Sequence, residues 1–82
     1  MEGKAESGMT VNMVRRMIPK RKQAAILEIY EDQDGFWIIL NEGWNADGMD
    51  FHCRTIHSGG DEMTDAETIA DLKDQISQIR KL

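Results

Sequence analysis

The sequence lacks the features on which several protein classes depend. Its 82 residues include one cysteine, Cys53, so no disulfide can form within the chain, and this favours a reducing compartment. No run approaches the roughly 20 apolar residues of a membrane-spanning helix. The N-terminus has no continuous apolar core of the kind that a signal peptide needs. We therefore expect a cytoplasmic protein that does not enter a membrane.

The chain also has little length from which to build a deep substrate cleft. Its 82 residues form one domain at most, and domains of this size often depend on a partner. Apolar residues make up 40% and charged residues 30%, which predicts a folded chain rather than a disordered one. We expect a binding protein without a cofactor rather than an enzyme.

A calcium-binding loop is started but not completed. The segment Asp32–Gly35 has the residue types that open such a loop. Tyr30 stands where the loop needs an acidic or amide ligand, and Asn41 stands where it needs a bidentate glutamate. The segment is therefore interpreted as a turn.

Zinc and triad residues are present in unsuitable arrangements. His52 would point away from Cys53 and His57 because side chains alternate along a strand, and a closed zinc site needs a fourth ligand. Ser58, His57 and Asp61 have the residue types of a catalytic triad, but they lie too close in sequence to converge from separate elements. We expect no metal site and no catalytic residue.

The net charge of −5 conceals two regions of opposite sign. Residues 1–23 hold six Lys or Arg against two Glu, whereas residues 24–82 hold four against thirteen acidic residues, a net of −9. An acidic body repels nucleic acid and attracts basic protein surfaces, and a basic arm does the reverse. We expect a flexible basic arm over 1–23 and a single domain over 24–82.

The arm has its own internal pattern. Residues 1–12 are small, polar and without period, which is typical of a disordered leader. Met13, Val14, Met17 and Ile18 have helical spacing, and Pro19 should end a short helix there. The cationic residues of the arm favour an alternative function in nucleic-acid binding. They are Arg15, Arg16, Lys20, Arg21 and Lys22.

From residue 24 the pattern is typical of strands. Residues 24–32 and 36–40 are rich in β-forming side chains, and Asp34–Gly35 between them predicts a type I′ hairpin turn. A second Asp-Gly, Asp47–Gly48, predicts another turn before a third strand within residues 49–57. The three segments predict an antiparallel meander.

A helix should follow the glycines at 59 and 60. Thr64 and Glu67 form a capping box, and Leu72 and Ile76 belong to one apolar stripe that also includes Ile69 and Ile79. The sequence therefore predicts an α+β fold of βββα order, in which the C-terminal helix packs on one face of the sheet.

Counting from the predicted turns assigns residues to the two faces of the sheet. The first face is uniformly apolar, and we place the helix there. It carries Leu27, Ile29, Phe36, Ile38 and Leu40, joined by Trp44, Phe51 and Cys53. The second face mixes apolar and charged side chains. It carries Ile26, Tyr30, Trp37, Ile39, Ile56, Glu28, Asp32, His52 and Arg54.

The second face is the candidate contact surface, because one helix covers only one face. An uncovered patch with large aromatic side chains is typical of an interface. The expected occupant is another protein, with a basic surface, or a second copy that forms a homodimer; residues 13–18 folded back over the face are the alternative. The predicted binding residues are Tyr30, Trp37, Ile39, Ile56, Arg54, Glu28 and Asp32.

The segment Glu28–Leu40 (EIYEDQDGFWIIL) resembles the opening hairpin of HicB-like antitoxin domains. Asp32, Asp34, Gly35, Phe36 and Trp37 match its acidic, aromatic turn, and the order strand–strand–strand–helix is similar over residues 25–80. NEGWNADG replaces the proline-rich stretch that follows the second strand in that family. The resemblance implies a module that occupies a partner protein.

Size and charge suggest a second class of binding protein. Small acidic α+β proteins are common among phage-encoded inhibitors, including anti-CRISPR proteins, which block nucleic-acid-binding sites with carboxylates. This is an analogy with no motif behind it. Both comparisons favour an inhibitor or regulator of another protein, from a phage or mobile element, and make nucleic acid the less favoured partner.

Overall fold

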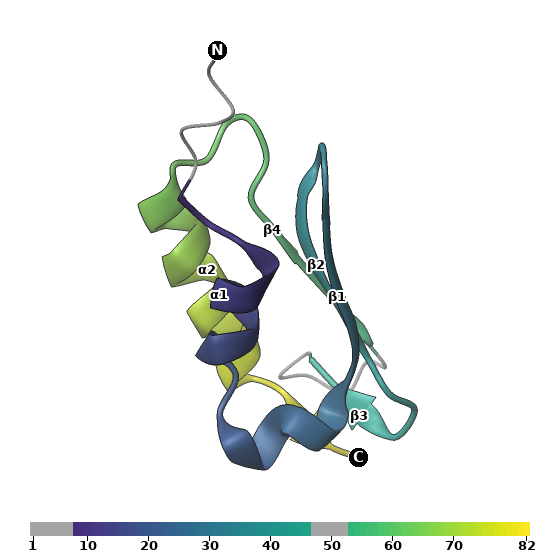
Figure 1. Ribbon diagram of the computed structural model, residues 1–82. Coiled ribbons are helices and arrows are strands. Elements are labelled where there is room, and N and C mark those ends of the chain that lie inside the picture. The colour runs from purple at the N-terminus through teal and green to yellow at the C-terminus, as the bar shows by residue number, and fades with distance from the viewer. Residues whose placement is uncertain (1–7, 47–52) are drawn as a thin grey trace.

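The computed structural model describes residues 8–46 and 53–82 and has the predicted α+β class. A three-stranded antiparallel sheet has the order β1-β2-β4, and helix α2 packs on it (Figure 1). The helices are α1 (Val11–Met17), the 3-10 helix η2 (Lys20–Ala25) and α2 (Asp65–Ser77); the strands are β1 (Ile26–Asp32), β2 (Gly35–Leu40), β3 (Trp44–Asn45), β4 (Thr55–Ser58) and β5 (Arg80–Lys81).

Residues of the predicted arm contribute to the core. Helix α1 begins after Thr10, whose hydroxyl accepts the Met13 amide at 3.2 Å, and it ends before Pro19 as predicted. Val14 and Ile18 are buried in the same apolar cluster as the side chains of α2. Both helices lie on one side of the sheet, with α1 over β1 and α2 over β4 (Figure 1). The alternative that residues 13–18 cover the second face is therefore wrong, because Val14 and Ile18 pack into the core on the other side of the sheet (Figure 1).

The first hairpin forms, but its turn lies one residue earlier than predicted. Asp32 pairs with Gly35, so Gln33 and Asp34 are the turn residues. Among Asp32–Gly35, only Gly35 has a positive φ, of 125°, and because the two turn residues do not, the predicted type I′ turn is excluded. The Asp32 carboxylate accepts the Asp34 amide at 2.8 Å and closes the turn locally. A Cβ at Gly35 would also lie 2.5 Å from the Ser58 carbonyl oxygen.

The predicted first face is the core face, with corrections at the start of β1. Ile29, Ile38 and Leu40 are buried there, as is Phe36, but Leu27 is 63% exposed. The register of β1 shifts between Ile26 and Glu28, so Ile26 takes the place opposite Leu40 and packs against the core. Its assignment to the second face was therefore wrong. This bulge turns Leu27 outward, because an extra residue in one strand moves its side chain off the alternating pattern.

The position of Ile56 differs from the one predicted for it on the third strand. Ile56 pairs with Ile38 and is fully buried on the core face, so its assignment to the second face was wrong. The predicted register depended on a turn at residues 47 and 48, which lie outside the described residues, as do Phe51 and His52. Trp44 packs against the core from β3, which pairs with β5 in a separate two-stranded sheet. Cys53 is half-buried ahead of β4.

Helix α2 has the predicted start and an unpredicted end. The Glu67 amide donates to the Thr64 hydroxyl at 3.1 Å, and the Thr64 amide donates to the Glu67 carboxylate at 2.9 Å, which confirms the capping box. Lys22 Nζ donates to the carbonyls of Ile76 and Ser77, at 3.0 and 3.1 Å. A cation at this end satisfies carbonyls that have no partner within the helix. The basic segment is thereby tied to the domain.

Candidate protein-binding surface

Three rings form a row across the sheet face opposite the helices. Tyr30, Trp37 and His57 come from β1, β2 and β4 and are neighbours in the strand register. The Tyr30 and Trp37 ring centroids are 6.2 Å apart with 12° between their planes, and those of Trp37 and His57 are 4.0 Å apart with 26°. We call these three side chains the aromatic row.

Two hydrogen bonds connect the row to the β1–β2 turn. Trp37 Nε1 donates to Asp32 Oδ1 at 3.0 Å, and His57 Nε2 lies 2.8 Å from the Asp34 carbonyl oxygen. Because a carbonyl oxygen only accepts, His57 carries a proton on Nε2 in this arrangement. The bond from Trp37, and then that from the Asp34 amide, lower the pKa of the Asp32 carboxyl below its ordinary value.

The helix layer fixes the strand that carries His57. Gln75 on α2 donates from Nε2 to the His57 carbonyl at 2.9 Å, and the Ser58 hydroxyl donates to Asp71 Oδ2 at 2.6 Å. The buried Ser58 and the exposed His57 ring therefore lie on opposite sides of one anchored strand. Side chains that are already fixed in the free protein lose less conformational entropy when a partner binds.

The row is accessible to a partner. Tyr30 is 37% exposed, His57 is exposed, and Trp37 and Ile39 are half-buried. Within residues 8–46 and 53–82, both α-helices lie over the other side of the sheet, so neither of them covers the row (Figure 1).

The structure brings together most of the predicted contact residues. Tyr30, Trp37 and Ile39 share one face with Glu28, which pairs with Ile39, and Asp32 lies at its turn end. Two predicted members fall outside this face. Ile56 is in the core. Arg54 is exposed, but it precedes β4 and lies opposite Leu40 of the core face, because its carbonyl accepts the Leu40 amide at 2.8 Å.

His57 is the member of the face that the sequence analysis missed. From the sequence, His57 is a candidate only for a zinc ligand or a triad base. The alternation of Ile56 and His57 would have found it, had the register of the third strand been known. Within the described residues, no group of three or more His, Cys, Asp or Glu side chains is placed to hold a metal ion.

The residues of the nucleic-acid alternative lie on α1 and η2. Arg15 and Arg16 are exposed in the last turn of α1, and Lys20 and Arg21 are exposed on η2. Lys22 instead caps α2. Partial burial, and then the charge of Arg21, lower the pKa of the Lys22 ammonium. Four of the five predicted cations are thus displayed to solvent.

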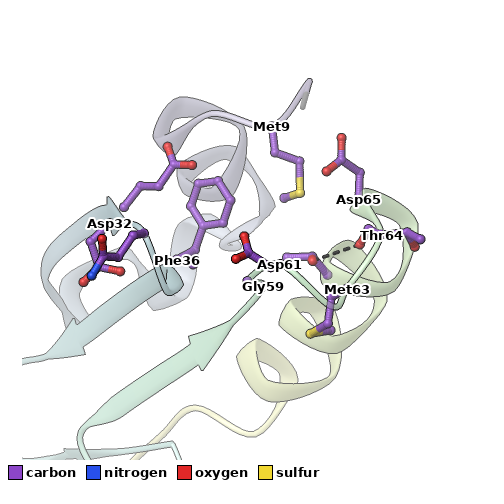
Figure 2. Close-up of a pocket in the computed structure, with 13 residues that line it drawn as sticks. Met9, Asp32, Phe36, Gly59, Asp61, Met63, Thr64 and Asp65 are labelled. Atoms are coloured by element: carbon purple, nitrogen blue, oxygen red, sulfur yellow. Dashed lines mark hydrogen bonds between the residues drawn. The ribbon is translucent and has the colours of Figure 1, made fainter. Parts of the chain in front are cut away.

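A pocket of about 380 Å³ lies near the same turn, between the β1–β2 hairpin, the glycines after β4 and the start of α2. Figure 2 shows Phe36 and Met9 beside it with the carboxylates of Asp32, Asp61 and Asp65. The Gly8 amide donates to Asp65 Oδ2 at 3.0 Å. The carboxylates that line the pocket make this end of the molecule acidic.

Comparison of the chain with protein-family models, with curated proteins and with solved structures finds no match. In the part of the chain that the structure describes, no helix has the length and apolar character needed to cross a bilayer. The function of the surface is therefore inferred from its own geometry.

Proposed function

We propose that this chain is a non-enzymatic interaction module that binds a partner protein through the sheet face carrying the aromatic row, and so inhibits or regulates that partner. The observation that supports this most is the row itself. Asp32 and the Asp34 carbonyl hold the Trp37 and His57 rings, and Tyr30 stacks on Trp37. All three rings nevertheless lie on the face that neither α-helix covers (Figure 1). Aromatic anchors dominate the energetics of many protein interfaces.

Charge favours a partner with a basic surface. Glu28 and Asp32 flank the rings, and residues 24–82 have a net charge of −9. An arginine of the partner can lie against a ring while its guanidinium pairs with a carboxylate. Long-range attraction between an acidic and a basic surface raises the rate of encounter.

The proposed mode of action is occupation of a partner's working surface. The likeness of Glu28–Leu40 to the HicB-like hairpin supports an antitoxin type of module, and the acidic body supports a phage-type inhibitor such as an anti-CRISPR protein. Both types use binding rather than catalysis. The proposed setting is the cytoplasm, where such partners are found.

Site-specific photocrosslinking in the source cell tests the proposal. A photoreactive residue at Ile39 should capture one discrete protein, and the same residue at Lys73, exposed on α2, should not. Against that purified protein, Trp37→Ala should raise the dissociation constant about thirtyfold, which corresponds to roughly 2 kcal/mol. Equal capture from both positions, or unchanged affinity in a folded Trp37→Ala variant, contradicts the proposal. Capture of a second copy makes the module a homodimer.

A second candidate function is nucleic-acid association through the basic residues of α1 and η2, which we call the basic end. It is supported by one observation: Arg15, Arg16, Lys20 and Arg21 are all exposed and are carried by helices. Such a surface binds phosphates without sequence preference. The acidity of residues 24–82 opposes it, so it ranks second.

A further inference from the structure

We propose that the outer edge of β1 accepts an extended basic segment of the partner as an additional strand. This inference rests on the proposed function, because it specifies how the partner protein is held. The sheet order β1-β2-β4 gives β1 a single neighbour among the described strands. An edge strand can pair with an extended peptide through its outward backbone groups.

The register shows which backbone groups point outward. The Leu40 amide donates to the Arg54 carbonyl at 2.8 Å, so the backbone groups of Leu40 face β4. Because these groups alternate along a strand, those of Ile39 and Trp37 face β1.

The partners of these residues on β1 follow from the pairing. Glu28 is opposite Ile39 and Tyr30 is opposite Trp37, so their backbone groups face β2. Those of Ile29 and Glu31 therefore face away from the sheet. No hydrogen bond within residues 8–46 and 53–82 engages them. Together they offer two donors and two acceptors to an added strand.

The side chains of β1 select the charge of that strand. Glu28, Glu31 and Asp32 are exposed, and the strand has no basic residue. Lysine or arginine on an added strand would lie beside these carboxylates, and opposite charges across a strand pair are favourable. The exposed Leu27 and Tyr30 supply apolar contacts on the same strand.

The same charges disfavour a second copy at this edge. Antiparallel pairing of two β1 strands centred on Glu31 places the two Glu31 side chains opposite each other. Pairing centred on Tyr30 places Glu28 opposite Asp32. Like charges directly opposite one another destabilise the pair. Carboxylates also protect an edge against aggregation in general, and the experiment distinguishes that role from binding.

The experiment uses the isotope-labelled full chain and a capped heptapeptide of alternating lysine and valine. Binding should produce cross-strand nuclear Overhauser effects to β1 and slow the hydrogen exchange of the Ile29 and Glu31 amides. The same peptide with glutamate in place of lysine should not bind. If neither peptide binds at millimolar concentration, or if both bind equally, the inference is overturned.

A pair of variants separates the edge from the aromatic row. Glu31→Pro removes one outward amide and spares the bonds to β2, because proline is tolerated where the missing donor faces solvent. It should weaken lysine-peptide binding about tenfold relative to Glu31→Gln, which loses the charge alone. If Glu31→Pro does not fold, the Glu31→Gln chain provides the test. The lysine peptide should still slow hydrogen exchange of the amides at positions 29 and 31 in that chain, and unchanged exchange there overturns the inference.

Protein binding that depends on Trp37 without protection of Ile29 and Glu31 would overturn strand addition and leave the proposed function standing. Protection at the edge with no effect of Trp37→Ala on partner affinity would do the opposite. The two proposals therefore fail separately.

Discussion

Trp37 donates its indole N–H to the carboxylate of Asp32, five residues earlier in the chain, at 3.0 Å. The same carboxylate oxygen accepts the Asp34 amide at 2.8 Å. One aspartate therefore closes the hairpin turn and orients the central ring of the aromatic row. The conformation of the turn and the geometry of the contact surface are coupled through this side chain.

The coupling predicts a loss of order at the row in acid. The folded-state pKa of Asp32 lies below its ordinary value because Trp37 and Asp34 donate to the charged form. The stability that the ionised Asp32 carboxylate gives to the folded chain is therefore complete above the ordinary pKa of an aspartate, about 3.9. This stability is lost as the pH falls through the folded-state pKa. The indole Nε1–H resonance of Trp37 should shift and exchange faster over that range. In Asp32→Asn this pH dependence should be absent; a titration that persists there would assign it to another group.

The core predicts that residues of the arm stabilise the domain. Val14 on α1 and Leu72 on α2 are both fully buried. Leu72→Ala should lower the free energy of unfolding by about 2–5 kcal/mol, and Val14→Ala by about 2 kcal/mol. Urea titrations followed by circular dichroism measure both. Lys73→Ala, exposed beside Leu72, is the control and should change little. A Val14→Ala chain as stable as wild type would mean that α1 does not dock.

The sequence predicted the elements more reliably than their registers. Thr64 and Glu67 act within one helical turn, and Pro19 acts on its immediate neighbour, so both signals depend only on local chemistry. The antiparallel order of the strands followed from the turn signals, and the apolar face of Ile29, Ile38 and Leu40 followed from alternation along each strand.

The wrong assignments all depend on a register. Leu27 is turned outward by a bulge whose extra residue no short-range pattern announces. Ile56 was placed by counting from a turn, and an error of one residue exchanges the two faces of a strand. His57 was missed for the same reason. The cap that Lys22 provides to α2 joins residues 54 and 55 positions apart, which sequence spacing cannot predict.

The basic end predicts weak, salt-sensitive binding to nucleic acid. Replacing Arg15, Arg16, Lys20 and Arg21 with glutamine should abolish it, because each phosphate contact contributes to the salt dependence. Lys22 stays unchanged in this variant, since its loss would also uncap α2. Fluorescence anisotropy with a labelled duplex at several salt concentrations measures the effect. Tight binding that depends on sequence would promote nucleic acid above the protein partner.

The last prediction separates the surface predicted from sequence from the one in the structure. His57 belongs to the aromatic row, with its ring centroid 4.0 Å from that of Trp37. Arg54 lies instead opposite Leu40, whose side chain is on the core face. His57→Ala should therefore weaken binding to the captured partner by about 0.5–1.5 kcal/mol, the range for a stacked aromatic pair. Arg54→Ala should leave the affinity within about twofold, as expected for a substitution away from the contact. Isothermal titration calorimetry on both variants, with circular dichroism to verify folding, compares them directly. A larger loss for Arg54→Ala than for His57→Ala would move the contact off the face of the row and toward the opposite side of β4.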